Sequence, residues 1–149
     1  MAQPFRLQVV LDVAERRLDA ATRELQRLRA HWTEAQAKLD QLAAYRTEYS
    51  ARLQARLALG LAAHQLRDYQ AFMGKLARAI DAQAEEVQRR RLAWEQEHTH
   101  WLGLRQRQQA LLVLAHRHRI TEAANEARAE QKQQNEFALR AVSKPPEGG

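Results

Sequence analysis

The chain has 149 residues, with 24 Lys and Arg against 18 Asp and Glu, and it contains no cysteine. Disulfides, thiolate nucleophiles, zinc fingers and iron–sulfur clusters are therefore excluded. Sandwich and α/β folds of this length need many turns, which are rich in Gly, Pro, Asn and Asp. The prolines lie only at the two ends, and the glycines between them are Gly60, Gly74 and Gly103. The composition thus favours long helices.

The chain shows neither a membrane span nor a signal peptide. Its longest wholly apolar runs fall far short of the roughly 20 residues that a spanning helix needs. The opening MAQPFRLQVV lacks the segments of a signal peptide, so we expect a soluble intracellular protein. The net charge of +6 suggests an anionic partner, such as nucleic acid, a membrane surface or an acidic protein.

Apolar residues in the first third recur at alternating steps of four and three. This spacing keeps one stripe facing a partner helix, and it predicts a coiled-coil helix over about residues 5–58. After Leu42 the steps become four, at Tyr45, Tyr49, Leu53 and Leu57, which rotates the stripe around the helix. The regular positions are Leu7, Leu11, Ala14, Leu18, Ala21, Leu25, Leu28, Trp32, Ala35, Leu39 and Leu42.

The stretch LALGLAAH holds the best candidate for a turn, at about residues 59–63. Gly60 can adopt the left-handed conformation that ends a helix. A second apolar seam then runs from Leu66 to Ala115 and predicts a helix over about residues 64–142. Its middle is interrupted by polar residues, so we expect the helix contact to be looser there; these residues are Gln83, Arg90 and Glu97.

The two seams match when the chain folds back at Gly60. A residue i of the first helix then faces a residue near 121 − i of the second, so that Tyr49 meets Phe72. The sequence therefore predicts an all-α fold, a single two-helix antiparallel coiled-coil hairpin. Its second helix extends beyond the first, from about His116 to Val142, and residues 143–149 form a disordered tail.

Two overlapping Glu-x-x-His pairs have the spacing found in di-iron bundles, Glu95 with His98 and Glu97 with His100. Such sites need two helices of this kind and two further glutamates, whereas both copies lie here on one polar stretch. Solvated side chains are the favoured interpretation. The sequence has no Gly-rich phosphate loop, and a hairpin two helices thick offers no cleft that excludes water. We expect no metal, no cofactor and no enzymatic activity.

A group of arginines in the second helix is the strongest cationic feature. They are spread around the helix, whereas a nucleic-acid-binding helix gathers its cations on one side. A solvated coiled-coil face is favoured, followed by an acidic protein partner and then by nucleic acid or lipid. The group comprises Arg89, Arg90, Arg91, Arg105, Arg107, Arg117 and Arg119.

The aromatic residues fall into two sets. Trp32, Trp94 and Trp101 occupy seam positions, which indicates core filling. Phe72 precedes the seam residue Met73, so it points partly away from the partner helix. One narrow seam cannot bury every large apolar group of this flank, and exposed aromatics usually mark a partner site. The predicted patch consists of Leu42, Tyr45, Tyr49, Phe72, Leu76, Ala79 and Gln83.

Three segments carry a family resemblance that extends over almost the whole chain. The chain resembles the FliJ family of flagellar export proteins in these segments, with Gly60 between the first two. They are Tyr45-x-x-Glu48-Tyr49, Tyr69-x-x-Phe72-Met73-x-x-Leu76-x-x-Ala79-Ile80-x-x-Gln83 and Glu130-Gln131-Lys132-x-x-Asn135-Glu136-Phe137.

The resemblance implies a coiled coil without activity of its own, similar to the central stalk of rotary ATP synthases. It implies that the aromatic patch contacts the export gate protein FlhA, and that some export chaperones bind as well. It also implies that the free ends of the coil enter the hexameric export ATPase FliI. In the second helix, the segment concerned is Glu130, Gln131, Lys132, Asn135, Glu136 and Phe137.

On this resemblance we expect a non-catalytic coupler of the flagellar type III export apparatus, located in the bacterial cytoplasm. Its partners would hold it peripherally at the inner membrane of the flagellar base. Two alternatives stay open. One is the stalk protein of a virulence-type secretion system. The other is a basic coiled coil that binds nucleic acid or anionic lipid, although nucleic acid is not expected as a partner.

Overall fold

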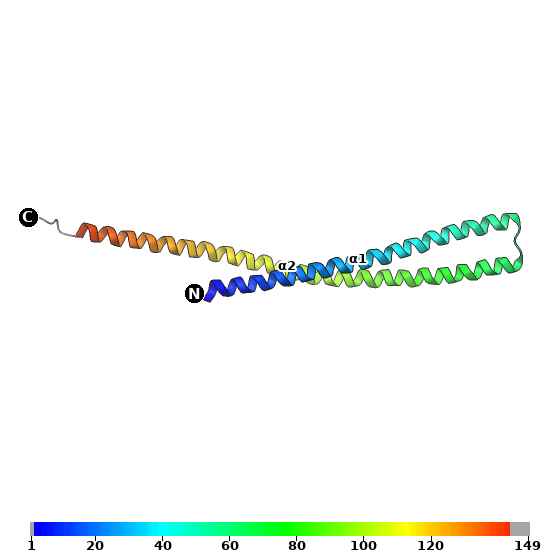
Figure 1. Cartoon of the computed structure of the whole chain (residues 1–149), viewed down its shortest axis with the longest axis horizontal. Helices are drawn as coiled ribbons and strands as arrows, with labels where there is room; N and C mark the ends of the chain where they lie inside the picture. The colour runs from blue at the N-terminus through cyan, green and yellow to red at the C-terminus, as the bar shows by residue number, and fades with distance from the viewer. Residues whose placement is uncertain (1, 144–149) are drawn as a thin grey trace, which may run out of the picture. The chain divides into compact units, whose positions relative to one another are not determined.

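The computed structural model describes residues 2–143, with side chains from Arg6 onward. Helix α1 spans Ala2–Leu59 with 58 residues, and helix α2 spans Ala63–Ser143 with 81 residues. Figure 1 shows the two helices running in opposite directions on either side of one turn. No strand occurs among the described residues. The predicted all-α hairpin is confirmed.

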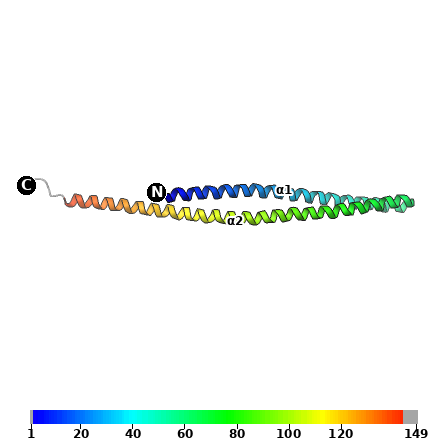
Figure 2. The ribbon, with the colours of Figure 1, turned by 90° about the horizontal axis from the view of Figure 1, so that it is seen from below.

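The hairpin divides into two compact units, each of which pairs a segment of α1 with a segment of α2. The turn unit consists of Leu18–Gly103 and contains Tyr45, Tyr49, Tyr69 and Phe72, which are described below. The terminal unit consists of Met1–Arg17 and Leu104–Gly149. In the terminal unit, α2 continues past the first residue of α1 (Figure 2). This extension accounts for the greater length of α2.

The turn occupies residues 60–62, inside the predicted range of 59–63. Gly60 has φ +93°, the left-handed conformation that favours glycine, and its N–H donates to the Leu57 carbonyl at 3.3 Å. The N–H of Ala62 donates to Oε1 of Gln65 at 3.3 Å, while the Ala62 carbonyl accepts from Leu66 at 3.0 Å. Gln65 thus reaches back to cap the start of α2.

The helix ends differ slightly from the predicted bounds. Helix α1 begins at Ala2 rather than near residue 5, because a proline in the first turn removes only an N–H that has no partner within the helix. Helix α2 includes Ser143, which was expected in the tail, and the Ser143 hydroxyl donates to the Arg140 carbonyl at 3.2 Å. The remaining predicted tail, residues 144–149, lies outside the described residues.

The core is a layer one side chain thick between the helices. Its buried residues all occupy predicted seam positions, namely Leu11, Ala14, Ala21, Ala35, Leu76 and Val87. Most other seam residues are half-buried, because two helices cannot surround a side chain completely. Where the spacing changes to fours, Tyr49 and Leu53 stay half-buried, whereas Tyr45 and Leu57 are exposed.

Two hydrogen bonds cross between the helices in the turn unit. The Gln83 side-chain amide donates to the Ala35 carbonyl at 2.9 Å, so a specific contact replaces the loose one expected at this polar position. The indole Nε1 of Trp101 donates to Oγ1 of Thr22, also at 2.9 Å. Both bonds join residues close to the predicted register. Across residues 2–143, neither helix contains a stretch long and apolar enough to cross a membrane.

Candidate functional site

Four aromatic rings gather on one flank of the turn unit, two from each helix. Tyr49 of α1 stacks on Phe72 of α2 with ring centroids 4.4 Å apart, and it also lies 5.4 Å from Tyr69. Tyr45 meets Phe72 edge-on at 6.1 Å and lies 5.7 Å from Tyr49. The Tyr49–Phe72 pair is the one that the hairpin register predicts.

The position of these rings follows from their offset relative to the seam. Phe72 directly precedes the seam residue Met73, and Tyr45 lies away from the seam on the same flank. Tyr45 remains 43% exposed, whereas Tyr49, Tyr69 and Phe72 are half-buried. The outermost ring is therefore available to a partner, and the inner rings hold the two helices together.

Two open hollows flank the rings. One is lined by Tyr49, Arg56, Gln65, Asp68, Tyr69 and Phe72. The other is lined by Gln41, Leu42, Ala44, Tyr45 and Glu48. Both hollows combine apolar walls with charged rims, so this surface can receive apolar side chains of another protein.

The structure separates the seven predicted patch residues by accessibility. Tyr45 and Ala79 are exposed. Leu76 is buried, with 6% of its surface exposed, so it offers almost no surface to a partner. The amide of Gln83 is engaged by the Ala35 carbonyl. Leu42, Tyr49 and Phe72 are half-buried and can contribute only part of their surface to a partner.

The segment predicted to bind the ATPase lies in the terminal unit, on a part of α2 that has no partner helix in the described chain. We call residues 123–143 the bare helix. Every residue over 123–143 is exposed, and Phe137 is 76% exposed. The last half-buried seam residues are Ala115, His118 and Glu122. The segment therefore presents all its sides, including those of Glu130, Gln131, Lys132, Asn135 and Glu136. It belongs to a different unit from the aromatic patch.

His98 has surroundings that sequence reasoning missed. It was expected to be solvated, but it is half-buried and stacks on Trp94 at 4.9 Å and on Trp101 at 6.0 Å. The signal was present in the spacing, since residues three and four apart are neighbours on a helix. Nδ1 of His100 lies 3.2 Å from Oε1 of Glu97. Among the described residues, no group of three side chains is arranged to hold a metal ion.

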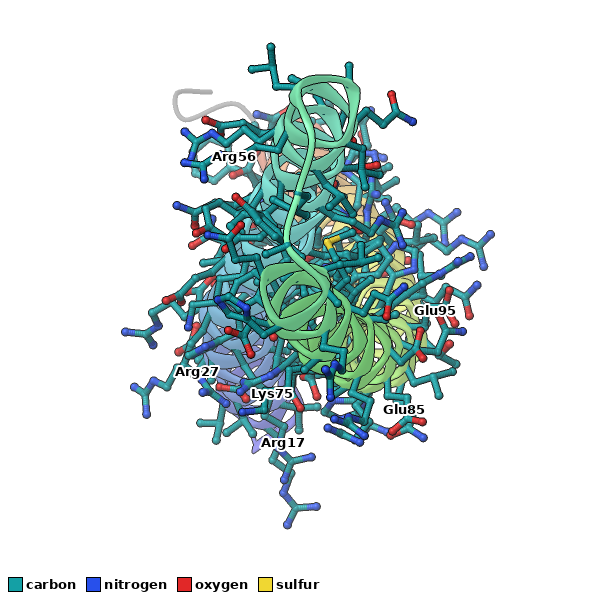
Figure 3. The ribbon with its side chains drawn as sticks, turned by 90° about the vertical axis from the view of Figure 1, so that its right-hand side faces the viewer. Arg17, Arg27, Arg56, Lys75, Glu85 and Glu95 are labelled. Carbon is teal, nitrogen blue, oxygen red and sulfur yellow. The ribbon has the colours of Figure 1, made fainter. Side chains whose placement is uncertain are left out.

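The run of arginines at residues 89–91 of α2 is hydrogen-bonded to acids on the same helix. Glu86 accepts hydrogen bonds from Arg89 and Arg90, and these bonds lower the pKa of its carboxyl group. Arg91 donates to Glu95 at 3.0 Å. Figure 3 shows labelled charged side chains, including those of Arg27 and Glu95, projecting outward from the ribbon. The run thus forms a solvated helix surface.

The chain is similar to known proteins over almost its whole length. The family model described as "Flagellar FliJ protein" matches residues 3–147. The chain is 31% identical over 147 residues to a Flagellar FliJ protein of Salmonella typhi, covering 99% of this chain and all of that protein. It is 29% identical over 151 residues to a Flagellar FliJ protein of Escherichia coli strain K12, with 99% and 100% coverage. No solved structure matches. A match of this extent, on a two-helix hairpin, shows that the chain belongs to the flagellar FliJ protein family.

Proposed function

We propose that this protein is a non-catalytic component of the flagellar type III export apparatus, where it couples the export ATPase ring to the membrane export gate. Membership of the family supports a role in flagellar export. The observation that carries the coupler role is the presence of two unlike free surfaces. One is an aromatic patch on the turn unit, and the other is the bare helix of residues 123–143 in the terminal unit.

The aromatic patch is the proposed contact with the export gate protein FlhA. Its exposed ring, Tyr45, can enter a partner pocket while Ala79 allows close approach. Burial of one large apolar side chain contributes roughly 1.5–3 kcal/mol. A few such groups suffice for a micromolar contact, which corresponds to about −8 kcal/mol. Export chaperones are proposed as further partners of the protein.

The bare helix is the proposed contact with the export ATPase FliI. Phe137 is its most exposed aromatic residue, and Glu130, Lys132 and Glu136 supply charges of both signs. A helix without an intramolecular partner can be surrounded by several subunits of a ring. The protein would then act in the bacterial cytoplasm and be held at the flagellar base by its partners.

Point variants can test the gate contact without damaging the hairpin. Replacing Tyr49 and Phe72 would remove rings that join the helices, so the exposed positions are better targets. We expect Tyr45→Ala with Ala79→Asp to weaken binding to the purified cytoplasmic part of the gate at least tenfold and to reduce motility. The double variant should leave helicity and ATPase binding intact.

A matched control is Ala51→Asp, because Ala51 is an exposed residue of α1 beside Met73 and does not line either hollow next to the rings. The control should retain gate binding. If the double variant is folded and still binds the gate with full affinity, the patch is not the gate contact. A parallel variant, Phe137→Asp, should weaken association with the ATPase ring and leave gate binding unchanged.

A further inference from the structure

Two matching stripes of side chains run along the terminal unit. On α1 the stripe has steps of four, three and four, and on α2 it has steps of three, four and three. Such steps keep each stripe on one side of its helix. Each stripe has arginines at its ends and apolar residues between them. The stripes are Arg6, Val10, Val13 and Arg17 on α1, and Arg107, Ala110, Leu114 and Arg117 on α2.

Both stripes lie on the same side of the helix pair. Every member directly precedes a seam residue of its own helix, and in an antiparallel pair the residues with this offset flank the seam on one common side. By the register rule, Val10 lies within one helical turn of the level of Leu114, and Arg17 within one turn of the level of Arg107. The apolar residues of the two stripes thus lie side by side, with a pair of arginines at each end. We call these eight residues the basic–apolar face.

The face is open to solvent. Val10 is 39% exposed, Val13 is 38% exposed and Leu114 is 50% exposed. The four arginines are exposed as well, and none forms an ion pair within the described part of the chain. Neither their charge nor the apolar rows are therefore covered by side chains of residues 6–143.

Acidic groups are absent from this side. The acids of α1 in the terminal unit, Asp12 and Glu15, directly follow seam residues and so lie on the opposite side. On α2 no acid occurs between Glu97 and Glu122. Arg105 and Arg119 also follow seam positions and share the side of Asp12 and Glu15. In the paired part of the terminal unit, acids thus accompany the arginines on the opposite side but not on the basic–apolar face.

We propose that the basic–apolar face docks on an anionic lipid bilayer surface. Guanidinium groups pair with lipid phosphates, and short aliphatic side chains enter the boundary between head groups and acyl chains. Protein hot spots are enriched in Trp, Tyr and Arg, and this face has arginines but no aromatic residue to anchor a protein partner. Nucleic acid is a poorer match, because valine and leucine would occupy the centre of the contact. The proposal does not depend on the export partners.

The expected binding is weak and reversible. One arginine near an anionic membrane raises the affinity about fivefold, the equivalent of about 1 kcal/mol. Four arginines can therefore account for an increase of several hundredfold over a neutral bilayer. The aliphatic residues add a smaller contribution, since each is already partly covered. Added salt should weaken the contact, because it screens exposed charges.

Vesicle flotation of the purified full-length protein tests this proposal. The vesicles are phosphatidylcholine alone or phosphatidylcholine mixed with phosphatidylglycerol. We expect binding only to the mixed vesicles, and a loss of about a hundredfold or more when Arg6, Arg17, Arg107 and Arg117 are all changed to Gln. A matched control changes Arg16, Arg119, Arg128 and Arg140 to Gln, which removes the same charge from the same unit. It should lose only a few-fold.

Circular dichroism should show equal helicity for both quadruple variants, because all eight arginines are exposed and Gln is a good helix former. Equal losses in the two variants would show that net charge alone determines binding, and they would overturn the proposal. Failure of the wild-type protein to float with the mixed vesicles would do so too. If, in addition, the first variant lost ATPase association, the face would be assigned to an acidic protein surface. Tyr45→Ala with Ala79→Asp should leave flotation unchanged.

Discussion

Polar contacts between the helices favour one register of this hairpin, in addition to the short turn at residues 60–62. An apolar seam built on a repeating spacing tolerates sliding by a whole heptad, because the same residue types meet again. The Trp101–Thr22 hydrogen bond does not tolerate it, because it needs two particular side chains, whereas the Ala35 carbonyl that accepts from Gln83 has an equivalent at every residue. Polar pairs of this kind add specificity to a coiled coil whose stability comes from its apolar residues.

Thr22→Val should lower the free energy of unfolding by about 0.5–1.5 kcal/mol, because it leaves the half-buried indole N–H of Trp101 without this acceptor. Urea unfolding measures the change. Thr47→Val is the matched control, since both hydroxyls donate to the carbonyl four residues earlier, but Thr47 is exposed. Equal effects of the two substitutions would contradict a role for the interhelical bond.

Because the Glu86 carboxylate is hydrogen-bonded in the folded protein, we expect the stability of the protein to depend on pH. Its hydrogen bonds from Arg89 and Arg90 lower its pKa in the folded protein below the ordinary value of 4.5. The resulting stabilisation is present above that ordinary value and is lost as the pH falls through the lowered pKa. Glu86→Gln should therefore reduce the melting temperature slightly near neutral pH. The difference from the wild-type protein should disappear in strong acid, and a difference that grew with acidity would contradict this assignment.

At the scale of the helix, the three internal glycines have different roles. Gly60 needs its left-handed conformation, and Gly60→Ala should destabilise the hairpin by about 1–2 kcal/mol. Gly74 and Gly103 lie inside α2, and a Cβ atom added at either would meet nothing within 4 Å. Gly74→Ala and Gly103→Ala should each stabilise the protein by about 0.5–1 kcal/mol in urea unfolding. A loss of stability at Gly74 or Gly103 would reveal a constraint that their surroundings do not show.

The two helices were predictable because a repeat of four and three leaves few alternatives. The turn was predictable too, since Gly60 is the only glycine between the two seams. The environment of His98 was not, because it depends on how two tryptophans fill a space between helices. Spacing identified the aromatic flank, but it could not show that Leu76 is buried while Tyr45 remains exposed.

At the scale of the whole molecule, stability and partner binding should be separable. Every residue over 123–143 is exposed, so this segment contributes little to the packing between helices. A chain ending at Glu122 should keep the wild-type melting temperature within about two degrees, by analogy with neutral changes at exposed sites. Circular dichroism during heating measures this. The truncated protein should lose ATPase association under the proposed function, and a large drop in melting temperature would show that the segment supports the fold.

The single turn also has a consequence for how the chain folds. Contacting residues are closest in sequence beside Gly60 and become steadily more distant toward the N-terminus of α1. Closing the first contacts beside the turn requires only a short loop, and each later pair adds to a structure that already exists. Folding should therefore start beside Gly60 and proceed like a zipper, and the last pairs to close should be the first to open. Amide hydrogen exchange would then be slow in α1 around Tyr49 and progressively faster toward its first turns.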